Sequence, residues 1–292
     1  MSLPEHANFL LIDGVLNKRK LNDLHQYEAS MEVCLLYGGT RWEPLQDLGP
    51  ILMKPSTPSS LITDWFSDPA AQKYSTVFSS AKFLNQVTDH LRPFICPPNA
   101  LDGSGLLRFS DPLVAHYWLS SLSAEQRDQL LGPIDHWWVP LPTHSWEPPA
   151  EIAWQIFSRV NPAPSSSPVH ASLDHAQLAA LDKAHRWKFE EDAYQWLAER
   201  DEQLFAGMDS QSISDWLKHT IDSGLEWGLV GEKALIIWAE TFADLGHDFT
   251  TRPNGPYLTW LNHNPDNACL VPVLRIKAFD HFRRSHKDTA HD

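Results

Sequence analysis

The chain has 292 residues, of which 42% are apolar and 21% charged, as in an ordinary globular protein. No stretch approaches the roughly 18 consecutive apolar residues that a membrane-spanning helix needs, so we expect no membrane insertion. The formal net charge of −14 repels phosphate backbones, which are bound by clustered Lys and Arg, so nucleic acid is not an expected partner.

The N-terminus and the cysteines bear on the cellular compartment. No Lys or Arg precedes the first apolar run, which ends at Asp13, so a signal peptide is not predicted. Cys34, Cys96 and Cys269 lie far apart and form no C-x-x-C pair, which argues against a disulfide framework and against a zinc site. We therefore expect a cytoplasmic protein with no metal and no other cofactor.

Residues 1–140 alternate short apolar runs with helical patterns, which is typical of an α/β lobe with a mixed sheet and packed helices. The apolar runs are nearly continuous, as in strands that are covered on both faces. We expect strands at residues 9–12, 32–37, 51–54, 76–78, 106–109 and 136–139, and helices at residues 61–66, 82–91 and 113–122. Asp111 followed by Pro112 is a favourable start for the last of these helices.

The composition changes after residue 140. Seven of the 22 prolines fall between residues 140 and 168, and proline cannot donate to a strand ladder. Residues 141–172 are therefore expected to form a Pro/Ser-rich linker.

The remaining sequence predicts a small all-α domain at residues 173–264, followed by a frayed basic tail at residues 265–292. Its helices are expected at residues 178–204, from Ser212, where Asp215 completes a capping box, and at residues 232–246. Residues 173–250 hold 16 acidic and 6 basic residues, a net charge of −10. A solvated helical face explains this charge most simply, and a surface that steers a basic partner is the functional alternative.

Signature motifs of catalysis are absent from the sequence: it contains no phosphate-binding glycine loop, no H-E-x-x-H and no G-x-S-x-G. Asp13 follows the first apolar run, where phosphatases of the haloacid dehalogenase type keep their nucleophile. Those enzymes have a second Asp two positions later, and this chain has Val15 there. We therefore predict no catalytic residue and interpret Asp13 and Gly14 as a structural turn, with a hydrolase that uses Asp13 as the alternative.

Arg108 lies within an apolar segment, where an unpaired charge would cost several kcal/mol. It therefore needs a carboxylate partner, and Asp13 and Asp111 are the candidates. We predict that this pair holds a structural junction.

The sequence closely resembles the N-terminal domain of the type VI secretion adaptor or effector-chaperone family, once known only as a domain of unknown function. The resemblance covers residues 8–140 and is carried by an ordered series of short motifs. Two positions depart from the family pattern, because Ser110 and Leu113 stand where an aromatic residue and an arginine are common. The helical region is also similar, through residues 227–229 and 245–249. The motifs are Leu11-Ile12-Asp13-Gly14, Gly39-Thr40, Gly49-Pro50, His90-Leu91-Arg92, Leu107-Arg108-Phe109, Asp111-Pro112 and Gly132-Pro133.

The resemblance implies a cytoplasmic adaptor that binds a secreted effector toxin and loads it onto the VgrG spike of the secretion apparatus. The expected protein-binding residues are those where Arg and Trp gather, since these residue types dominate binding energy. They are Arg41, Trp42, Arg92, Trp137 and Trp138. An immunity protein that binds the toxin is a further alternative.

Overall fold

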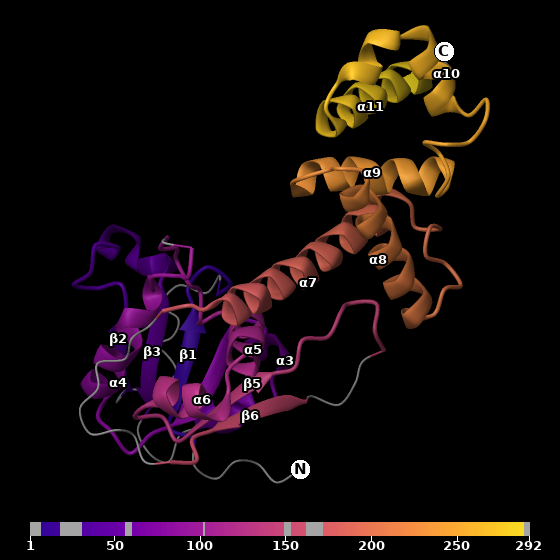
Figure 1. The fold of residues 1–292 in the computed structure, drawn as a ribbon. Helices are drawn as coiled ribbons and strands as arrows, with labels where there is room; N and C mark the ends of the chain where they lie inside the picture. Colours follow the sequence, from indigo (N-terminus) through magenta and orange to yellow (C-terminus); the bar gives the residue numbers. More distant parts are fainter. Residues whose placement is uncertain are drawn as a thin grey trace. The chain divides into compact units, whose positions relative to one another are not determined.

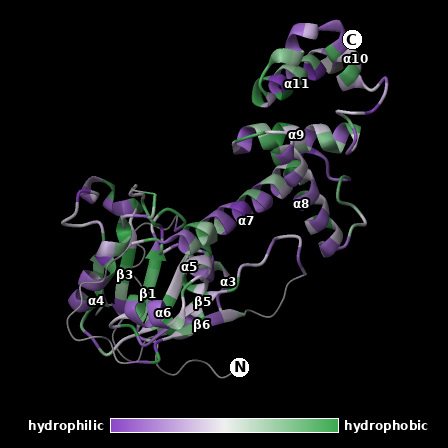
Figure 2. Cartoon of the chain, viewed as in Figure 1, coloured by the Kyte–Doolittle hydropathy of each residue, from purple (hydrophilic) through white to green (hydrophobic). Residues whose placement is uncertain are grey.

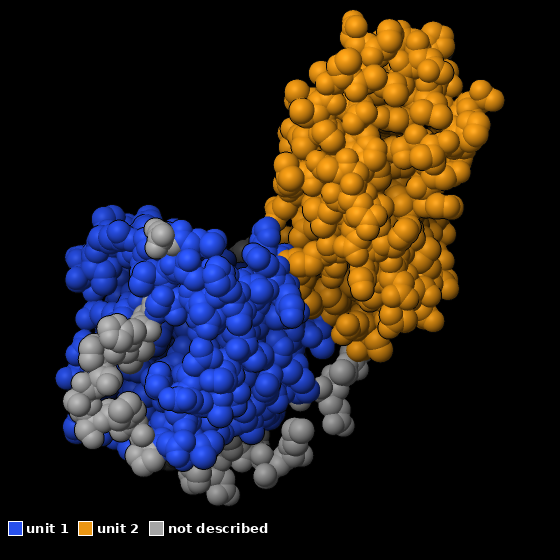
Figure 3. All heavy atoms as spheres, viewed as in Figure 1, with its two compact units in different colours: residues 1–143, 149–185 blue, residues 144–148, 186–292 orange. Residues whose placement is uncertain are grey.

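The computed structural model describes residues 7–17, 31–55, 60–101, 103–148, 153–161 and 172–288. The chain forms two compact units (Figure 3). The first unit comprises residues 1–143 and 149–185, and the second comprises residues 144–148 and 186–292. Helix α7 (His175–Arg200) contributes residues to both units. Within the described residues, no helix is long and apolar enough to cross a membrane.

The first unit is an α/β lobe built on a six-stranded sheet with the order β2-β3-β1-β4-β5-β6 (Figure 1). We expected a mixed sheet, but every pair of neighbouring strands is antiparallel. The central strand β1 pairs with β3 on one side and with β4 on the other, and β2 and β6 are the two edges. The strands are β1 Phe9–Asp13, β2 Met31–Leu35, β3 Pro50–Pro55, β4 Ser75–Ser79, β5 His136–Pro140 and β6 Trp154–Ser158.

Each face of the sheet is covered by helices, and this explains why the central strands are continuously apolar (Figure 2). In β1, Phe9 and Leu11 join one core, while Leu10 and Ile12 join the core on the opposite face. The first core is covered by α4 Leu84–Leu91, η2 Arg92–Ile95, α5 Pro112–Ser120 and α6 Ala124–Leu131, and the second by α2 Ser60–Trp65 and α3 Pro69–Gln72. A further helical turn, η1 Glu43–Leu48, precedes β3.

The predicted strand at residues 106–109 does not form. This segment is extended, but it lies outside the sheet, and Leu107 donates its amide to the carbonyl oxygen of Ile95 at 3.0 Å. Leu107 and Phe109 still point into the first core, where both are buried. An extended segment that crosses over a core has the same apolar pattern as a strand.

The predicted linker at residues 141–172 instead contains strand β6. Residues 154–158 pair with β5 over five positions, from His136 opposite Ser158 to Pro140 opposite Trp154. Phe157 is buried in the first core. The prolines that suggested a linker flank this strand and do not interrupt it. The sheet therefore has six strands, as many as were predicted, with β6 in place of the predicted strand at residues 106–109.

The described part of the second unit is helical. Beyond the last part of α7, its core is formed by aromatic and aliphatic side chains of α8, α9, α10 and α11. The predicted helices at residues 178–204 and 232–246 correspond to α7 and α9. The remaining elements are α8 Ser210–Glu226, α9 Glu232–Leu245, α10 Pro256–His263, η3 Pro265–Cys269 and α11 Pro272–Asp288.

Two predictions about this unit need correction. Helix α8 begins at Ser210, and its N-cap is Asp209, whose carboxylate accepts the amide of Ser212 at 2.7 Å. Ser212 is therefore inside the first turn and not the cap. The predicted tail also forms helix α11, because Ile276 and Phe279, one turn apart, are fully buried in the core of the unit.

Candidate functional site

Strand β1 ends at a buried carboxylate whose two oxygens accept four hydrogen bonds. Asp13 is 2% exposed. Its Oδ1 accepts hydrogen bonds from the amides of Val15 and Leu16 at 3.0 Å and from Arg108 Nη2 at 2.7 Å. Its Oδ2 accepts a hydrogen bond from the hydroxyl of Ser110 at 2.9 Å. The carboxylate therefore holds the turn after β1 against the segment that leads into α5.

Arg108 contacts both carboxylates that the sequence offered as partners. Besides Asp13, its Nη2 lies 3.5 Å from Oδ2 of Asp111. Burial lowers the pKa of Arg108, but the hydrogen bond and the charge of Asp13 outweigh burial and raise the pKa above its ordinary value. Burial raises the pKa of Asp111, and the nearby positive charge of Arg108 opposes this effect.

The same junction starts helix α5 as predicted. Asp111 is the N-cap, with its Oδ1 accepting the amide of Leu113 at 3.0 Å, and Pro112 occupies the first turn. The hydroxyl of Ser110 donates to Asp13 Oδ2 in the same junction. The hydrogen bonds of Asp13 therefore join the turn after β1 to the residues that start α5.

A close backbone contact joins the turn after β1 to the end of η1. The amide of Gly14 donates to the carbonyl oxygen of Gly49 at 3.2 Å. A Cβ atom at position 14 would lie 2.5 Å from that oxygen and 2.8 Å from the carbonyl oxygen of Asp47, which no side chain tolerates. Glycine is thus required at position 14 by the contact itself. The contact brings residues 14–16 alongside the last residues of η1.

An exposed apolar surface lies on these two adjoining segments. Val15 follows Gly14 and is 48% exposed, while Leu45 and Leu48 of η1 are 47% and 51% exposed. We name these three side chains the β1-end patch. Exposed apolar side chains that form one contiguous patch are typical of a surface that binds another protein, whereas single exposed ones are ordinary. In the sequence these three side chains have the apolar pattern of core residues, which does not mark them as exposed.

Arg41 and Trp42 precede η1 directly, and the structure places them beside one another. The guanidinium carbon of Arg41 lies 4.9 Å from the ring centroid of Trp42, and Nη2 lies 2.8 Å from Sγ of Cys96. Arg41 is exposed, whereas Trp42 is partly buried against the first core and near the ring of Tyr37. Both directly precede η1, the element that carries Leu45 and Leu48 of the β1-end patch.

Trp137 and Trp138 are not at the surface, so the structure gives no support to a direct contact of either with a partner. They alternate along β5, and each is buried in a different core. Trp137 Nε1 donates to Thr76 Oγ1 at 2.9 Å, which fixes the ring inside the lobe. The two tryptophans were expected at the surface because a central strand and an edge strand read alike in sequence.

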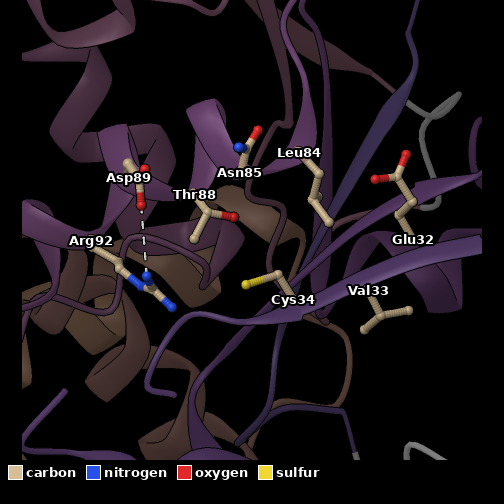
Figure 4. Close-up of a pocket in the computed structure, with 8 residues that line it drawn as sticks. All are labelled: Glu32, Val33, Cys34, Leu84, Asn85, Thr88, Asp89 and Arg92. Carbon is tan, nitrogen blue, oxygen red and sulfur yellow. Dashed lines mark ion pairs between the residues drawn. The ribbon is translucent and has the colours of Figure 1, made fainter. Parts of the chain in front are cut away.

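A groove of about 370 Å³ runs between β2 and α4 (Figure 4). We name it the edge groove, because β2 is an edge strand. Arg92, one of the predicted binding residues, lines it and donates from Nη2 to the carbonyl oxygen of Gly38 at 2.8 Å and from Nε to that of Leu36 at 3.4 Å. Its lining residues are Glu32, Val33, Cys34, Leu84, Asn85, Thr88, Asp89 and Arg92.

Arg92 thereby connects the edge groove to the chain segment that leads from β2 to Arg41. The two carbonyl groups to which it donates belong to this segment, so one guanidinium contacts both the groove and the segment. Of the groove residues, only Arg92 was predicted from the sequence as a binding residue. The others lie on two elements that are distant in the chain, and only the packing of α4 against β2 brings them together.

Residues 8–129 match a family model described as "Domain of unknown function (DUF4123)". No curated protein and no solved structure matches the chain. The matched residues are less than half of the chain, and they include Asp13, Arg108, the β1-end patch and the edge groove. Over this segment, which runs from the start of β1 into α6, the chain is similar to the DUF4123 domain.

Proposed function

We propose that the protein is an adaptor that binds a type VI secretion effector in the cytoplasm and loads it onto the VgrG spike. The observation that carries the proposal is the β1-end patch next to Arg41 and Trp42. Exposed aliphatic side chains beside an Arg and a Trp have the composition of a protein-binding surface. The resemblance of residues 8–140 to the adaptor family supplies the kind of partner, and the DUF4123 match over residues 8–129 covers the same surface.

The state of Asp13 argues against the alternative of a hydrolase. A carboxylate nucleophile needs access to its substrate. Asp13 is buried, and its two oxygens accept four hydrogen bonds from Val15, Leu16, Arg108 and Ser110. The same hydrogen bonds fix the turn that carries Val15 of the β1-end patch, because a group that is held by several hydrogen bonds keeps its neighbours in place.

The proposal is tested by co-purification from cells that express this protein together with a type VI effector and its VgrG spike. We expect the effector to bind this protein, and the effector to associate with the spike only when this protein is present. If neither protein binds it, and effector delivery survives its deletion, the adaptor proposal is wrong. If deletion instead harms the producing cell through its own toxin, the protein is an immunity protein.

The patch is tested separately. Leu45→Asp and Leu48→Asp place charge on the β1-end patch at half-exposed positions, so we expect the fold to persist and effector binding to weaken by about tenfold or more, as for a central contact. Val160→Asp is the matched control, since Val160 is exposed in the same unit on the segment after β6. Equal binding by all three variants would exclude the patch as the contact surface.

A further inference from the structure

Strand β2 has a free edge within the described part of the sheet. It pairs with β3 only, from Met31 opposite Pro55 to Leu35 opposite Ile51. The amide of Leu36 donates to the carbonyl oxygen of Pro50 at 2.9 Å, so this amide faces β3. Because these groups alternate in an antiparallel pair, the amide and carbonyl of Val33 point away from β3. They face the side on which a further strand could pair.

The edge groove lies along this free edge. Glu32 and Cys34 are two positions apart on β2 and point to the same side, toward α4 (Figure 4). From α4, Asn85 and Asp89 are one helical turn apart and line the opposite wall. The carboxylates of Glu32 and Asp89 are both exposed, one on each wall. Each wall of the groove therefore carries one carboxylate, and that of Asp89 lies 3.7 Å from Arg92 Nη1.

Thr88 supplies a second, independent sign of a missing ligand. The residue is only 3% exposed, and its Oγ1 has no hydrogen-bond partner among the described residues. Thr88 lines the edge groove, and Figure 4 shows its hydroxyl turned toward Cys34 and Leu84. A buried hydroxyl without a partner is unfavourable, so such groups in native proteins are normally satisfied by protein, water or ligand.

The positive charge in the groove is already engaged. Arg92 donates to the carbonyl groups of Gly38 and Leu36, and its Nη1 lies 3.7 Å from Oδ1 of Asp89. Lys54, which is opposite Glu32 in the sheet register, donates to the carbonyl oxygen of Lys82 at 3.2 Å. Neither cation donates to Glu32 in these contacts, and its exposed carboxylate remains accessible at the mouth of the groove.

We propose that an extended segment of the effector adds to the sheet beside β2 and inserts a Lys or Arg side chain into the edge groove. The backbone of Val33 would pair with the segment, and Glu32 and Asp89 would attract the inserted cation. The hydroxyl of Thr88, which is buried in the unbound chain, would turn into the groove and accept a hydrogen bond from it. This inference rests on the proposed function and adds the chemistry of the bound segment: a strand with a basic residue on the face that turns toward α4.

Cys34 allows a direct test, because it lies in the groove and becomes the only thiol after Cys96→Ala and Cys269→Ser. The probes are seven-residue Thr/Val peptides with a central Cys, blocked as the mixed disulfide with β-mercaptoethanol. Two positions after the Cys, on the same face of a strand, they carry Lys, Glu or norleucine. The Cys34 thiolate attacks the mixed disulfide, forms the protein–peptide disulfide and releases β-mercaptoethanol. Intact-mass spectrometry then gives the β-mercaptoethanol concentration that halves labelling.

We expect the β-mercaptoethanol concentration that halves labelling to be about fivefold higher for the Lys peptide than for the Glu peptide. A ratio of this size corresponds to the free energy of a partly exposed ion pair. In the Glu32→Gln/Asp89→Asn variant this ratio should fall close to one, while Asp64→Asn, a change of an exposed carboxylate on α2, should leave it unchanged. Thr88→Val should weaken retention of the Lys peptide, and Thr88→Ser should preserve it. A preference for Glu, or a Lys preference that survives the double variant, would overturn the cation site.

Strand pairing is tested with two N-methylated forms of the Lys peptide. N-methylation removes amide donors, and only one of the two alternate sets of amides can face β2. We expect one form to lose retention and the other to keep it. Equal retention of both forms would overturn the pairing.

The failure of this inference is separable from failure of the proposed function. If the wild-type protein co-purifies with the effector and Glu32→Gln/Asp89→Asn does so equally well, the groove is not the effector site and the adaptor proposal stands. If the wild-type protein does not bind the effector, the adaptor proposal falls, and with it the assignment of the groove to an effector, whatever the peptides show.

Discussion

At the scale of single residues, the Asp13–Arg108 pair makes a specific prediction about stability. Removing one partner of a buried ion pair leaves the other charge without compensation, which usually costs more than the pair itself contributes. Arg108 is partly exposed, so water compensates some of this loss. We expect Arg108→Ala to lower the free energy of unfolding by about 2 to 4 kcal/mol, as measured by urea denaturation.

The control for this prediction is Arg41→Ala. Arg41 is exposed and its contacts are to Trp42 and Cys96, so its loss should change stability by less than about 1 kcal/mol. If both variants unfold at the same urea concentration as the wild type, the junction has no structural role.

Glu191 in the second unit predicts a pH dependence. Burial raises its pKa, but hydrogen bonds from His144, Ser145 and Gln195 outweigh burial and lower the pKa from 4.5 to about 2. Since the pKa is lower in the folded state, the stabilisation is present above about pH 4.5 and is lost as the pH falls toward 2. At pH 6.5 this stabilisation is on the order of 3 kcal/mol.

Urea unfolding of the wild type and of Glu191→Gln at pH 6.5 and at pH 3.5 measures this effect. All other carboxyl groups titrate in both proteins, so the change in the difference between them reports Glu191. We expect the advantage of the wild type to shrink by about 1 to 1.5 kcal/mol at pH 3.5. A difference that is constant with pH would mean that the hydrogen bonds of Glu191 do not favour its charged form.

At the scale of elements, strand β6 makes Phe157 and Ile156 a matched pair. They are neighbours on one strand and point to opposite faces, so Phe157 is buried in the first core and Ile156 is half-exposed. We expect Phe157→Ala to cost about 3 to 5 kcal/mol of unfolding free energy and Ile156→Ala less than about 1 kcal/mol. Similar small losses for both would fit the linker that the sequence predicted and not a strand.

Helix α11 is tested by shortening the chain. A frayed tail could be removed without effect, whereas loss of residues 265–292 would expose the core around Trp260 and remove Ile276 and Phe279 from it. We expect the shortened protein to lose amide hydrogen-exchange protection throughout α8 and α9. Phe279→Ala in the full chain should destabilise the same helices by about 3 to 5 kcal/mol. Unchanged protection in both would mean that α11 does not belong to the core.

At the scale of the whole molecule, the second unit uses a segment from an earlier part of the chain. Residues 144–148 belong to it, and Trp146 is buried among side chains of α7, α8 and α9. His144 stacks between the rings of Trp146 and Trp187, with centroid distances of 4.0 and 4.2 Å. Residues 173–264, the domain boundaries predicted from the sequence, therefore omit part of this unit.

We expect Trp146→Ala to reduce hydrogen-exchange protection in α8 and α9, by about 3 kcal/mol or more for a large buried aromatic side chain, while strands β1 to β4 keep theirs. The control is Trp196→Ala, in which a half-exposed tryptophan of the same unit is removed and a smaller loss is expected. Equal protection in Trp146→Ala and the wild type would show that the segment does not support the unit.

Local chemistry was enough to predict several features correctly. The continuous apolar run of β1 identified a strand covered on both faces, Asp111-Pro112 identified the start of α5, and the cost of an unpaired buried charge identified the partners of Arg108. Each of these depends on neighbours in the chain or on one residue's need for compensation. The same kind of argument failed for residues 106–109, where an apolar extended segment packs on the core without joining the sheet.

The sequence by itself therefore determined the two-part character of this protein, the α/β lobe, most of its strands and helices, and the carboxylates available to Arg108. Only the tertiary structure decided that Trp137 and Trp138 are buried, that β6 extends the sheet, that α11 and residues 144–148 complete the helical unit, and that Glu32, Thr88 and Asp89 share a groove. The physical reason is that burial and proximity depend on which elements pack together. A short apolar pattern predicts that a side chain is buried, but it does not predict which element packs against it.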